Sequence, residues 1–598
     1  MIPKADQPSG RISWFGLRLN SVLAGIFWAA ALDCPAQPTP QPAATPIRLN
    51  TIGYLPDAPK LVTIAGTADQ FLVADARSGN EVFRGRLSPV EPQTGGSHDA
   101  RIMLADFSAL DRAGSYRLLI PGVGESPEFR IGPDVFNWPF YCVTRAMYLW
   151  RCGCAVEAGF AGHTFRQEAC HIHDAYLDHA GGPEGARRAS VGGWHDAGDY
   201  NKYTVNGAFT AGMMLQAWEH FGDRLASLRL DIPESNNNVP DFLDEVRWEL
   251  DWLLTMQSDD GRVFHKLSTL EFGGFVMPHE ETERRYFSPW SSAGTASFTA
   301  VMAKAARIYK PYDEPFARRC LAAAEKSYQH LAAHPKDHRP DLSAFSTGPY
   351  DSPDSDDRLW AAAELYETTG KDAYLRDLDE RLRSAEASTA RGPVTVDIEW
   401  DWGNLRNLGL FTYLLSKREG RDAALVDRLR GDSIRTADSI IETARRHPYA
   451  RPLGAKHYWG CNGTVARQTM NLHVAHQLTG KATYRSAMLD TINHLLGRNP
   501  FGRSYVTGLG HRPPLAPHDR RSGGDDVVPP WPGYLVGGPW PKPTDWSDVQ
   551  QDYNTNEIAI NWNGAFIYAL AAFVEPDRFD ASIAAAKRAA TTRSAATQ

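Results

Sequence analysis

A stretch of twelve residues, Gly192–Tyr203, concentrates the side chains with which this chain could do chemistry. It reads GGWHDAGDYNKY and places two carboxylates, Asp196 and Asp199, three positions apart, directly after His195. Two carboxylates that close raise each other's proton affinity, so that one of them can act as a base near neutral pH. Aromatic rings beside carboxylates suit a sugar, whose C–H faces stack on rings. On this stretch alone, an Asp-rich turn that caps a helix from about residue 205 is an equally good interpretation.

Two further sequence blocks near the other end of the chain favour a catalytic site over a helix-capping turn. A proline-rich turn at 513–517 leads into His518, Asp519 and Arg520, and the run DYNTNEIAINWN, which starts at residue 552, contains Glu557. The Ile-Ala-Ile sequence after Glu557 gives it an apolar setting, which favours the raised pKa that a general acid needs. The alternative for Glu557 is an ordinary glutamate in the first turn of a helix.

Taken in their order, the three blocks resemble glycoside hydrolase family 9, once called cellulase family E. GGWHDAGDYNKY, the H-x-R after the proline-rich turn and DYxxNE carry the resemblance, and VPDFLDE at 239–245, YWG at 458–460 and LGRNP at 496–500 link them. The resemblance extends from about Ile47 to Phe573. It implies an inverting hydrolase with Asp199 as the base, Asp196 holding the water and tuning Asp199, and Glu557 as the general acid.

The same resemblance implies the residues that bind the substrate. His518 and Arg520 would hydrogen-bond to sugar hydroxyls, and Trp459 and Tyr553 are the aromatic platforms inside the matching motifs. Three further aromatic residues are weaker platform candidates, because an arbitrary Trp or Tyr more often belongs to a core: Tyr458, Trp290 and Trp402. Asp519 stands where many relatives have a second His, and Trp540 where they often have Asn, so both bear on substrate preference.

A metal site is predicted beside the first block. Cys152, Cys170, His171 and His195 offer two thiolates and two imidazoles, a suitable tetrahedral set for structural zinc, and the family resemblance implies zinc at these positions. Cys154 is a rival ligand, and a Cys152–Cys170 disulfide is the alternative in an exported protein. Calcium is also common in the family, and the oxygen-rich segment 234–245 could bind it, but a capped helix start explains that segment as well.

Composition and the N-terminus narrow the function classes. The chain has 598 residues, a formal net charge of −8 and 11% aromatic residues, and no Lys/Arg-rich patch, so we expect no nucleic-acid partner. Residues 1–36 read as a signal peptide, with positive charge before a short apolar run and cleavage after Ala36. Residues 37–46 form a flexible lead. No later segment could span a membrane, so we expect a secreted or periplasmic monomer.

The elements that must position these residues fall into two domains. Short β-rich runs punctuated by Gly, Pro and Asp predict a β-sandwich over 47–134, where the family has an immunoglobulin-like module, and we favour a structural brace over a substrate-binding role. Helical periodicity then predicts about twelve helices over 135–575, the first near 137–156 and the last near 557–573. An even number of helices that follow one another in pairs suggests an α/α toroid, and the family resemblance implies an (α/α)6 barrel. Residues 576–598 read as a C-terminal tail of frayed helix and disorder.

The predicted function is a secreted, inverting endo-β-1,4-glucanase, a cellulase acting on β-1,4-linked polysaccharides or oligosaccharides. One alternative keeps the same hydrolytic chemistry but changes the sugar or the point of attack: an exo-acting β-glucosaminidase or cello-oligosaccharide hydrolase. In a glucosaminidase, Asp519 could bind the amino group of the sugar. The other alternative is a non-catalytic sugar-binding protein, which would be expected to lack Asp199 or Glu557.

Overall fold

The computed structural model describes residues 46–90, 101–388 and 395–597. The expected signal peptide, and the expected lead except for Pro46, lie outside these ranges. No helix within them is long and apolar enough to cross a membrane.

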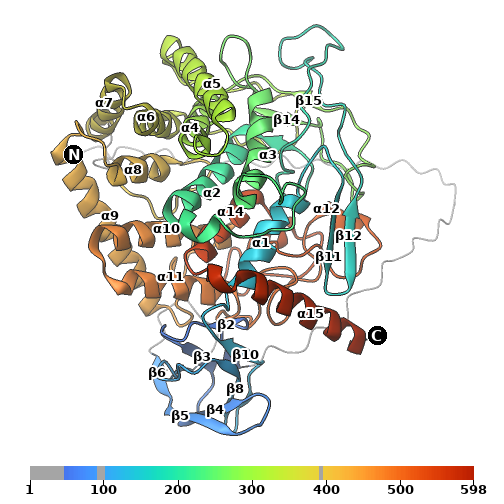
Figure 1. The fold of residues 1–598 in the computed structure, drawn as a ribbon, viewed down its shortest axis with the longest axis vertical. Helices are drawn as coiled ribbons and strands as arrows, with labels where there is room; N and C mark the ends of the chain where they lie inside the picture. The colour runs from blue at the N-terminus through green and yellow to red at the C-terminus, as the bar shows by residue number, and fades with distance from the viewer. Residues whose placement is uncertain (1–45, 91–100, 389–394, 598) are drawn as a thin grey trace, which may run out of the picture. The chain divides into compact units, whose positions relative to one another are not determined.

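The N-terminal part is a β-sandwich of two sheets (Figure 1). The first sheet has the order β1 (Ile47–Arg48), β3 (Leu61–Ala65), β7 (Ile102–Asp106) and β6 (Ser88–Val90). The second has the order β2 (Gly53–Tyr54), β10 (Phe129–Ile131), β8 (Gly114–Ile120), β4 (Gln70–Asp75) and β5 (Glu81–Arg86), with β9 (Gly124–Glu125) paired to β8. Alternate residues such as Val62 and Ile64 or Phe71 and Val73 point into a shared apolar core, as the two-residue period of a strand requires.

The sandwich is hydrogen-bonded to the helical part of the chain. The Thr51 amide donates to the Leu496 carbonyl at 3.0 Å, and the Thr63 hydroxyl donates to the Pro448 carbonyl at 2.7 Å. Arg498, from the LGRNP segment, donates through Nε to the Thr63 hydroxyl at 3.1 Å. These contacts join the sandwich to residues 448 and 496–498 of the helical part.

Helices dominate the second domain (Figure 1). Among its described residues, twelve helices of ten or more residues can be assigned. They are α1 (Asn137–Leu149), α2 (Thr204–Leu225), α3 (Asp241–Thr255), α4 (Ser292–Tyr309), α5 (Glu314–Ala333), α6 (Ser355–Thr369), α7 (Asp372–Ser388), α8 (Arg406–Leu415), α9 (Ala423–Arg446), α10 (Cys461–Thr479), α11 (Ala482–Leu495) and α14 (Ile560–Ala571).

Six of these helices form an inner ring. Helix α2 packs against α4, α4 against α6, α6 against α8, and α14 against both α10 and α2. An Asn407–Asn471 hydrogen bond of 3.1 Å joins α8 to α10 and completes the ring. The inner helix α14 is buried all round, whereas the outer helix α9 buries only one stripe, around Leu425 and Leu429, which is the pattern expected of inner and outer layers. The architecture is an (α/α)6 barrel.

Two helix ends differ from the predicted ranges because the chain turns there into the site. The predicted helix over 137–156 ends at Leu149, since the next residues pair with the Gly192–Tyr203 loop. The predicted helix over 557–573 begins at Ile560, since residues 557–559 form isolated bridges to other loops. In the expected C-terminal tail, η1 (Pro576–Arg578) and α15 (Phe579–Thr597) are helical, and α15 packs against α1.

Short elements line the loops between the helices. Strands β11 (Val156–Phe160) and β12 (His163–Gln167) form a hairpin, and β13 (Lys202–Tyr203), β14 (Lys266–Ser268) and β15 (Tyr286–Phe287) form a small sheet. The long irregular segment at 500–555 contains α12 (Arg520–Gly524) and leads into α13 (Tyr553–Asn556).

Candidate active site and metal centre

The Gly192–Tyr203 loop is fixed to the end of helix α1. The His195 amide donates to the Trp150 carbonyl at 2.9 Å, and the Cys152 amide donates to the Gly193 carbonyl at 2.8 Å. Gly193 has a φ of +76°, and a Cβ there would lie 2.8 Å from the Trp252 ring. Only glycine satisfies both the backbone conformation and this close approach.

The three sequence blocks meet through their backbones. The Ile560 amide donates to the Asp196 carbonyl at 2.9 Å, and the Arg520 amide donates to the Gly198 carbonyl at 3.1 Å. A Cβ on Gly198 would lie 2.3 Å from the His518 carbonyl oxygen. The glycine between the two aspartates is therefore required for the loops to approach, and it brings Asp199 into the same site as Glu557.

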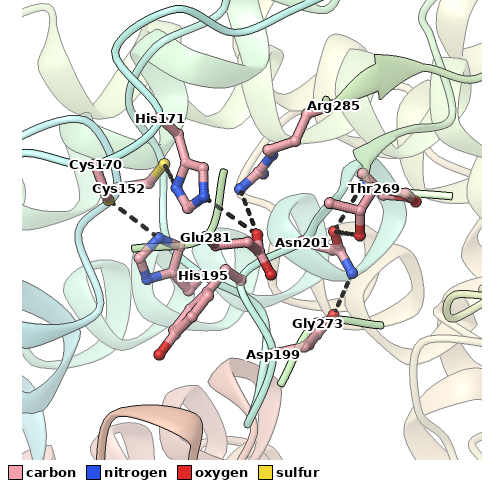
Figure 2. A network of polar contacts seen from close by, with 12 residues as sticks. Cys152, Cys170, His171, His195, Asp199, Asn201, Thr269, Gly273, Glu281 and Arg285 are labelled. Carbon is pink, nitrogen blue, oxygen red and sulfur yellow. Dashed lines mark hydrogen bonds and ion pairs between the residues drawn. The ribbon is translucent and has the colours of Figure 1, made fainter. Parts of the chain in front are cut away.

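The two aspartates are held by different partners. Asp196 is buried, and its two oxygens accept hydrogen bonds from the Asn206 amide at 2.6 Å and the Tyr350 hydroxyl at 2.7 Å. Burial, and then the charge of Asp199, raise the pKa of Asp196 to about 8. The Oδ2 atom of Asp199 accepts from the Asn201 amide at 2.7 Å (Figure 2) and from the Tyr203 hydroxyl at 3.2 Å. Within the described residues Oδ1 of Asp199 has no hydrogen-bond partner, so it remains able to accept one from a water.

Glu557 has the electrostatic setting of an acid. Burial raises its pKa well above the usual value, and the charges of Asp199 and Asp196 raise it further, whereas Arg520 lowers it. These influences favour the protonated carboxyl group, which is the state that can protonate a leaving oxygen.

His518 and Arg520 lie on either side of Asp519, at the start of α12. The Nδ1 atom of His518 donates to the Gln550 carbonyl at 2.7 Å, so in the neutral ring Nε2 is an acceptor. Burial lowers the pKa of His518, which favours this neutral ring. Arg520 donates through Nε to the Gly273 carbonyl at 3.0 Å, which leaves its terminal nitrogens as directional donors.

Two of the predicted platforms are exposed and adjacent. Trp459 is 52% exposed and Tyr553 is 49% exposed. Their ring centroids lie 6.0 Å apart, and the Tyr553 ring lies 6.0 Å from that of His518. The three weaker candidates are half-buried. The ring centroid of Trp290 lies 4.0 Å from that of His338, and the ring centroid of Trp402 lies 4.8 Å from that of Tyr350.

The four predicted metal ligands form one cluster. One ligand atom from each of Cys152, Cys170, His171 and His195 lies within 4.8 Å of all the others. The Cys152 sulfur lies 3.6 Å from Nδ1 of His171, and the Cys170 sulfur lies 3.5 Å from Nε2 of His195 (Figure 2). A sulfur and a nitrogen bound to one tetrahedral zinc would lie about 3.6 Å apart, given the usual bond lengths. Both thiols are free, so the alternative disulfide is absent between these two residues.

A second layer of side chains orients the cluster. The Nε2 atom of His171 lies 3.2 Å from the Glu281 carboxylate, which in turn lies 4.0 Å from Arg285 (Figure 2). A carboxylate behind a ligating imidazole fixes its tautomer and leaves Nδ1 free to bind a metal. Cys154, the rival ligand, is not part of the cluster.

Comparison with known proteins identifies the family. Residues 140–570 match the glycosyl hydrolase family 9 profile, and residues 42–125 match the cellulase N-terminal Ig-like domain. The chain belongs to glycosyl hydrolase family 9. Endoglucanase D of Acetivibrio thermocellus is 50% identical to this family 9 chain over 533 residues, covering 88% of this chain and 83% of that protein.

Other family 9 proteins are similar to this chain in sequence and in structure. The xyloglucan-specific endo-β-1,4-glucanase BoGH9A of Bacteroides ovatus is 36% identical over 588 residues, which is 91% of this chain and 96% of that protein. The structure of a metagenome-derived family 9 endoglucanase superposes with a TM-score of 0.82 at 36% identity, covering 88% of this chain and 98% of the other. A Zn-binding triple mutant of the family 9 endoglucanase J30 superposes with a TM-score of 0.80 at 31% identity, covering 87% and 100%. The expected family and fold are confirmed.

Asp519 does not face the substrate in this family 9 enzyme. Its side chain is fully buried and accepts hydrogen bonds from Arg521 at 3.1 Å and from the Ser522 hydroxyl at 2.8 Å. It therefore cannot act as the acidic partner that an amino sugar would require, which removes the feature that favoured a glucosaminidase.

The oxygen-rich segment considered for calcium is engaged internally. Glu234 and Glu245 both bind Arg151, and Asp241 accepts from the Leu230 amide and the Ser235 hydroxyl. Among the described residues, the only metal-type cluster of His, Cys, Asp and Glu is the one around Cys152. The start of α3 has Pro240 at its N-cap and no side-chain cap, so ion pairs and local hydrogen bonds, rather than helix capping, engage Glu234, Asp241 and Glu245.

Sequence reasoning missed two residues that hold Asp196. Asn206 lies in the first turn of α2, and Tyr350 lies in the loop before α6. Asn206 is close enough to the motif to have been considered. No local pattern distinguishes Tyr350, because its contact with Asp196 spans 154 positions.

The electrostatics predict an alkaline limit to activity. The acid must be protonated, and burial and two carboxylates raise the pKa of Glu557, so the rate should fall as the pH rises through that raised pKa. A pH profile of kcat on a soluble β-glucan measures this. An alkaline limb that is unchanged when Glu557 is replaced would show that another group sets it.

Proposed function

We propose that this family 9 hydrolase is an endo-acting β-1,4-glucanase that inverts the anomeric centre, with Glu557 as the acid and Asp199 as the base. The observation that carries the assignment is the difference between the two aspartates. Both oxygens of Asp196 already accept hydrogen bonds, whereas Asp199 has an uncommitted Oδ1. The relatives named endoglucanase support endo action on β-1,4-glucans.

The proposed steps use only the side chains described above. Glu557 donates its proton to the glycosidic oxygen as the bond to the anomeric carbon breaks. Oδ1 of Asp199 takes a proton from a water that attacks the opposite face of the sugar. Asp196 helps to hold the water and tunes Asp199, while His518 and Arg520 hydrogen-bond to sugar hydroxyls and Trp459 and Tyr553 support sugar rings.

The product's stereochemistry tests this mechanism. Attack by water from the face opposite the leaving group should give the α-anomer first from a β-linked glucan. The two carboxyl groups should then stand about 6.5–9.5 Å apart, leaving room for the water. Proton NMR in the first minutes, before mutarotation, reads the anomer directly. If the β-anomer appears first, Asp199 is not the base.

We propose zinc as the metal of the Cys152 cluster. Two thiolates and two imidazoles are a zinc donor set, and four protein ligands make a closed, structural site. When bound, the ion would supply a cross-link with no Lewis-acid role in hydrolysis, because no ligand position is left for water. His195 directly precedes Asp196, so the cross-link would fix the backbone that carries the aspartates.

We also propose that the chain is exported. The support is the positive charge followed by a short apolar run within residues 1–36. N-terminal sequencing of protein recovered outside the cytoplasm should begin at or near Gln37. Full-length protein retained in the cytoplasm of its natural host would contradict export.

A further inference from the structure

Two tyrosines hold the two aspartates of the site, and they lie against each other. The Tyr350 hydroxyl donates to Asp196 at 2.7 Å, and the Tyr203 hydroxyl donates to Asp199 at 3.2 Å. The ring centroids of the two tyrosines are 4.6 Å apart. Tyr350 has a φ of +44°, in the left-handed region that a bulky side chain rarely adopts. Such a conformation persists only where the surrounding structure fixes the backbone.

Two adjacent residues fix the backbone directly before the left-handed tyrosine. The Lys266 ammonium, at the start of β14, donates to the Thr347 carbonyl at 3.2 Å, the Thr347 hydroxyl at 2.8 Å and the Gly348 carbonyl at 2.9 Å. Nε2 of His265 lies 2.6 Å from the Pro349 carbonyl, and it is the donor, because a carbonyl oxygen only accepts. Three consecutive carbonyls are therefore bound by two neighbouring side chains.

Lys266 also lies beside the other tyrosine. Strands β13 and β14 pair with Tyr203 opposite Lys266, and Nζ of Lys266 lies 5.6 Å from the centroid of the Tyr203 ring, within the range of a cation–π contact. A Cβ on Gly348 would lie 3.1 Å from the Tyr203 hydroxyl oxygen. The loop that Lys266 binds therefore packs directly against the hydroxyl group that binds Asp199.

Lys266 is a buried cation whose hydrogen bonds all go to this loop. Its side chain is fully buried, and among the described residues it forms hydrogen bonds with residues 347–348 and no ion pair. Burial lowers its pKa to about 8 against the opposing influence of the Asp199 charge, so the ammonium form predominates at neutral pH. A buried ammonium is costly unless its N–H groups are bonded. An apolar side chain would fill the same space without that cost.

We propose that Lys266 is a positioning residue for the attack of water: its bonds to the loop at 347–348 place the Tyr350 hydroxyl on Asp196, and its contact with Tyr203 supports the hydroxyl on Asp199. The inference rests on the proposed inverting mechanism and deepens it. Lys266 acts through the two tyrosines, because it bonds neither carboxylate. Without it, the strained backbone at Tyr350 relaxes and the aspartates lose the hydrogen bonds that distinguish them.

A double-mutant cycle between Lys266 and Tyr350 tests this role. Lys266→Met removes the donors but keeps a long side chain, and kcat on a soluble β-glucan should fall by up to about 10²-fold. KM should stay unchanged, because the predicted substrate-binding residues do not contact Lys266. Tyr350→Phe should lower kcat in the same way. The double variant should lie within about 2-fold of the more impaired single variant, because both changes remove one contact. Lys266→Gln keeps N–H donors and should recover part of kcat.

The matched control is Lys60→Met in the β-sandwich. Lys60 is also fully buried, and its ammonium likewise donates to three oxygens, the carbonyls of Pro56, Ala58 and Ser108. Calorimetry should show that Lys60→Met and Lys266→Met both lower the Tm, since each removes a set of buried hydrogen bonds. Only Lys266→Met should lower kcat, which separates positioning from stability.

The outcomes separate the positioning role from the proposed function. Losses in kcat that multiply in the double variant, or wild-type kcat in Lys266→Met or in Tyr350→Phe, overturn the positioning role and leave the glucanase function standing. Failure of both Lys266 variants to fold makes Lys266 a purely structural residue and overturns the role as well. A wild-type enzyme that cleaves no β-1,4-glucan overturns the proposed function, and the positioning role with it.

Discussion

Replacing Glu557 by Gln is expected to lower kcat on unactivated β-glucans by about 10²- to 10⁴-fold, the usual contribution of a general acid. This substitution should not lower the stability of the folded protein. The folded-state pKa of Glu557 is raised, so folding favours the protonated form, and the charged form lowers stability as the pH rises above the unfolded-state pKa. A neutral Gln removes that cost. The variant should therefore melt at the same temperature as the wild type or higher at neutral pH.

Leaving-group dependence distinguishes the acid from the base. An aryl β-glycoside with a strongly acidic phenol needs no protonation to leave, so Glu557→Gln should recover much of its rate on such a substrate. Asp199→Ala should be equally impaired on natural and activated substrates, because the attacking water still lacks a base. Glu184→Gln, at an exposed surface position, is the control and should behave as wild type. Near-normal kcat for either active-site variant would remove that residue from the mechanism.

Replacing Cys170 by Ser is expected to abolish stoichiometric metal binding. The wild type should contain about one zinc per chain, and the variant should contain almost none after dialysis, because a serine hydroxyl is not a zinc ligand at neutral pH. Loss of a structural metal belongs to the most destabilising class of changes, and we expect the Tm to fall by about 5 to 10 °C. Elemental analysis and calorimetry measure both effects without reference to activity.

The control for this variant is another buried, free thiol. Cys320 lies on α5, outside the cluster, so Cys320→Ser should retain the metal whatever its effect on packing. Metal-free wild-type protein should lose the same stability as Cys170→Ser. A Cys152–Cys170 disulfide found by peptide mapping of native protein would show that the cluster does not hold an ion.

Much of this protein follows from its sequence alone. Two aspartates separated by Ala-Gly, an H-x-R and an Asn-Glu in that order are specific enough to indicate the family. Hydrophobic periodicity predicted the twelve helices, because each must bury an apolar stripe or be buried all round. The four metal ligands were predicted from residue type and family resemblance, and the structure brings all four together.

Other properties depend on contacts between distant segments. Tyr350 bonds Asp196 from the loop before α6, and this contact helps to leave Asp199 as the carboxylate with a free oxygen. Asp519 looked available from its place beside His518, but Arg521 holds it inside the protein. Helices α1 and α14 end and begin where the loops of the site pair with each other. Sequence periodicity reports only which residues are buried, whereas the direction of a loop side chain is decided by the partners that the barrel brings to it.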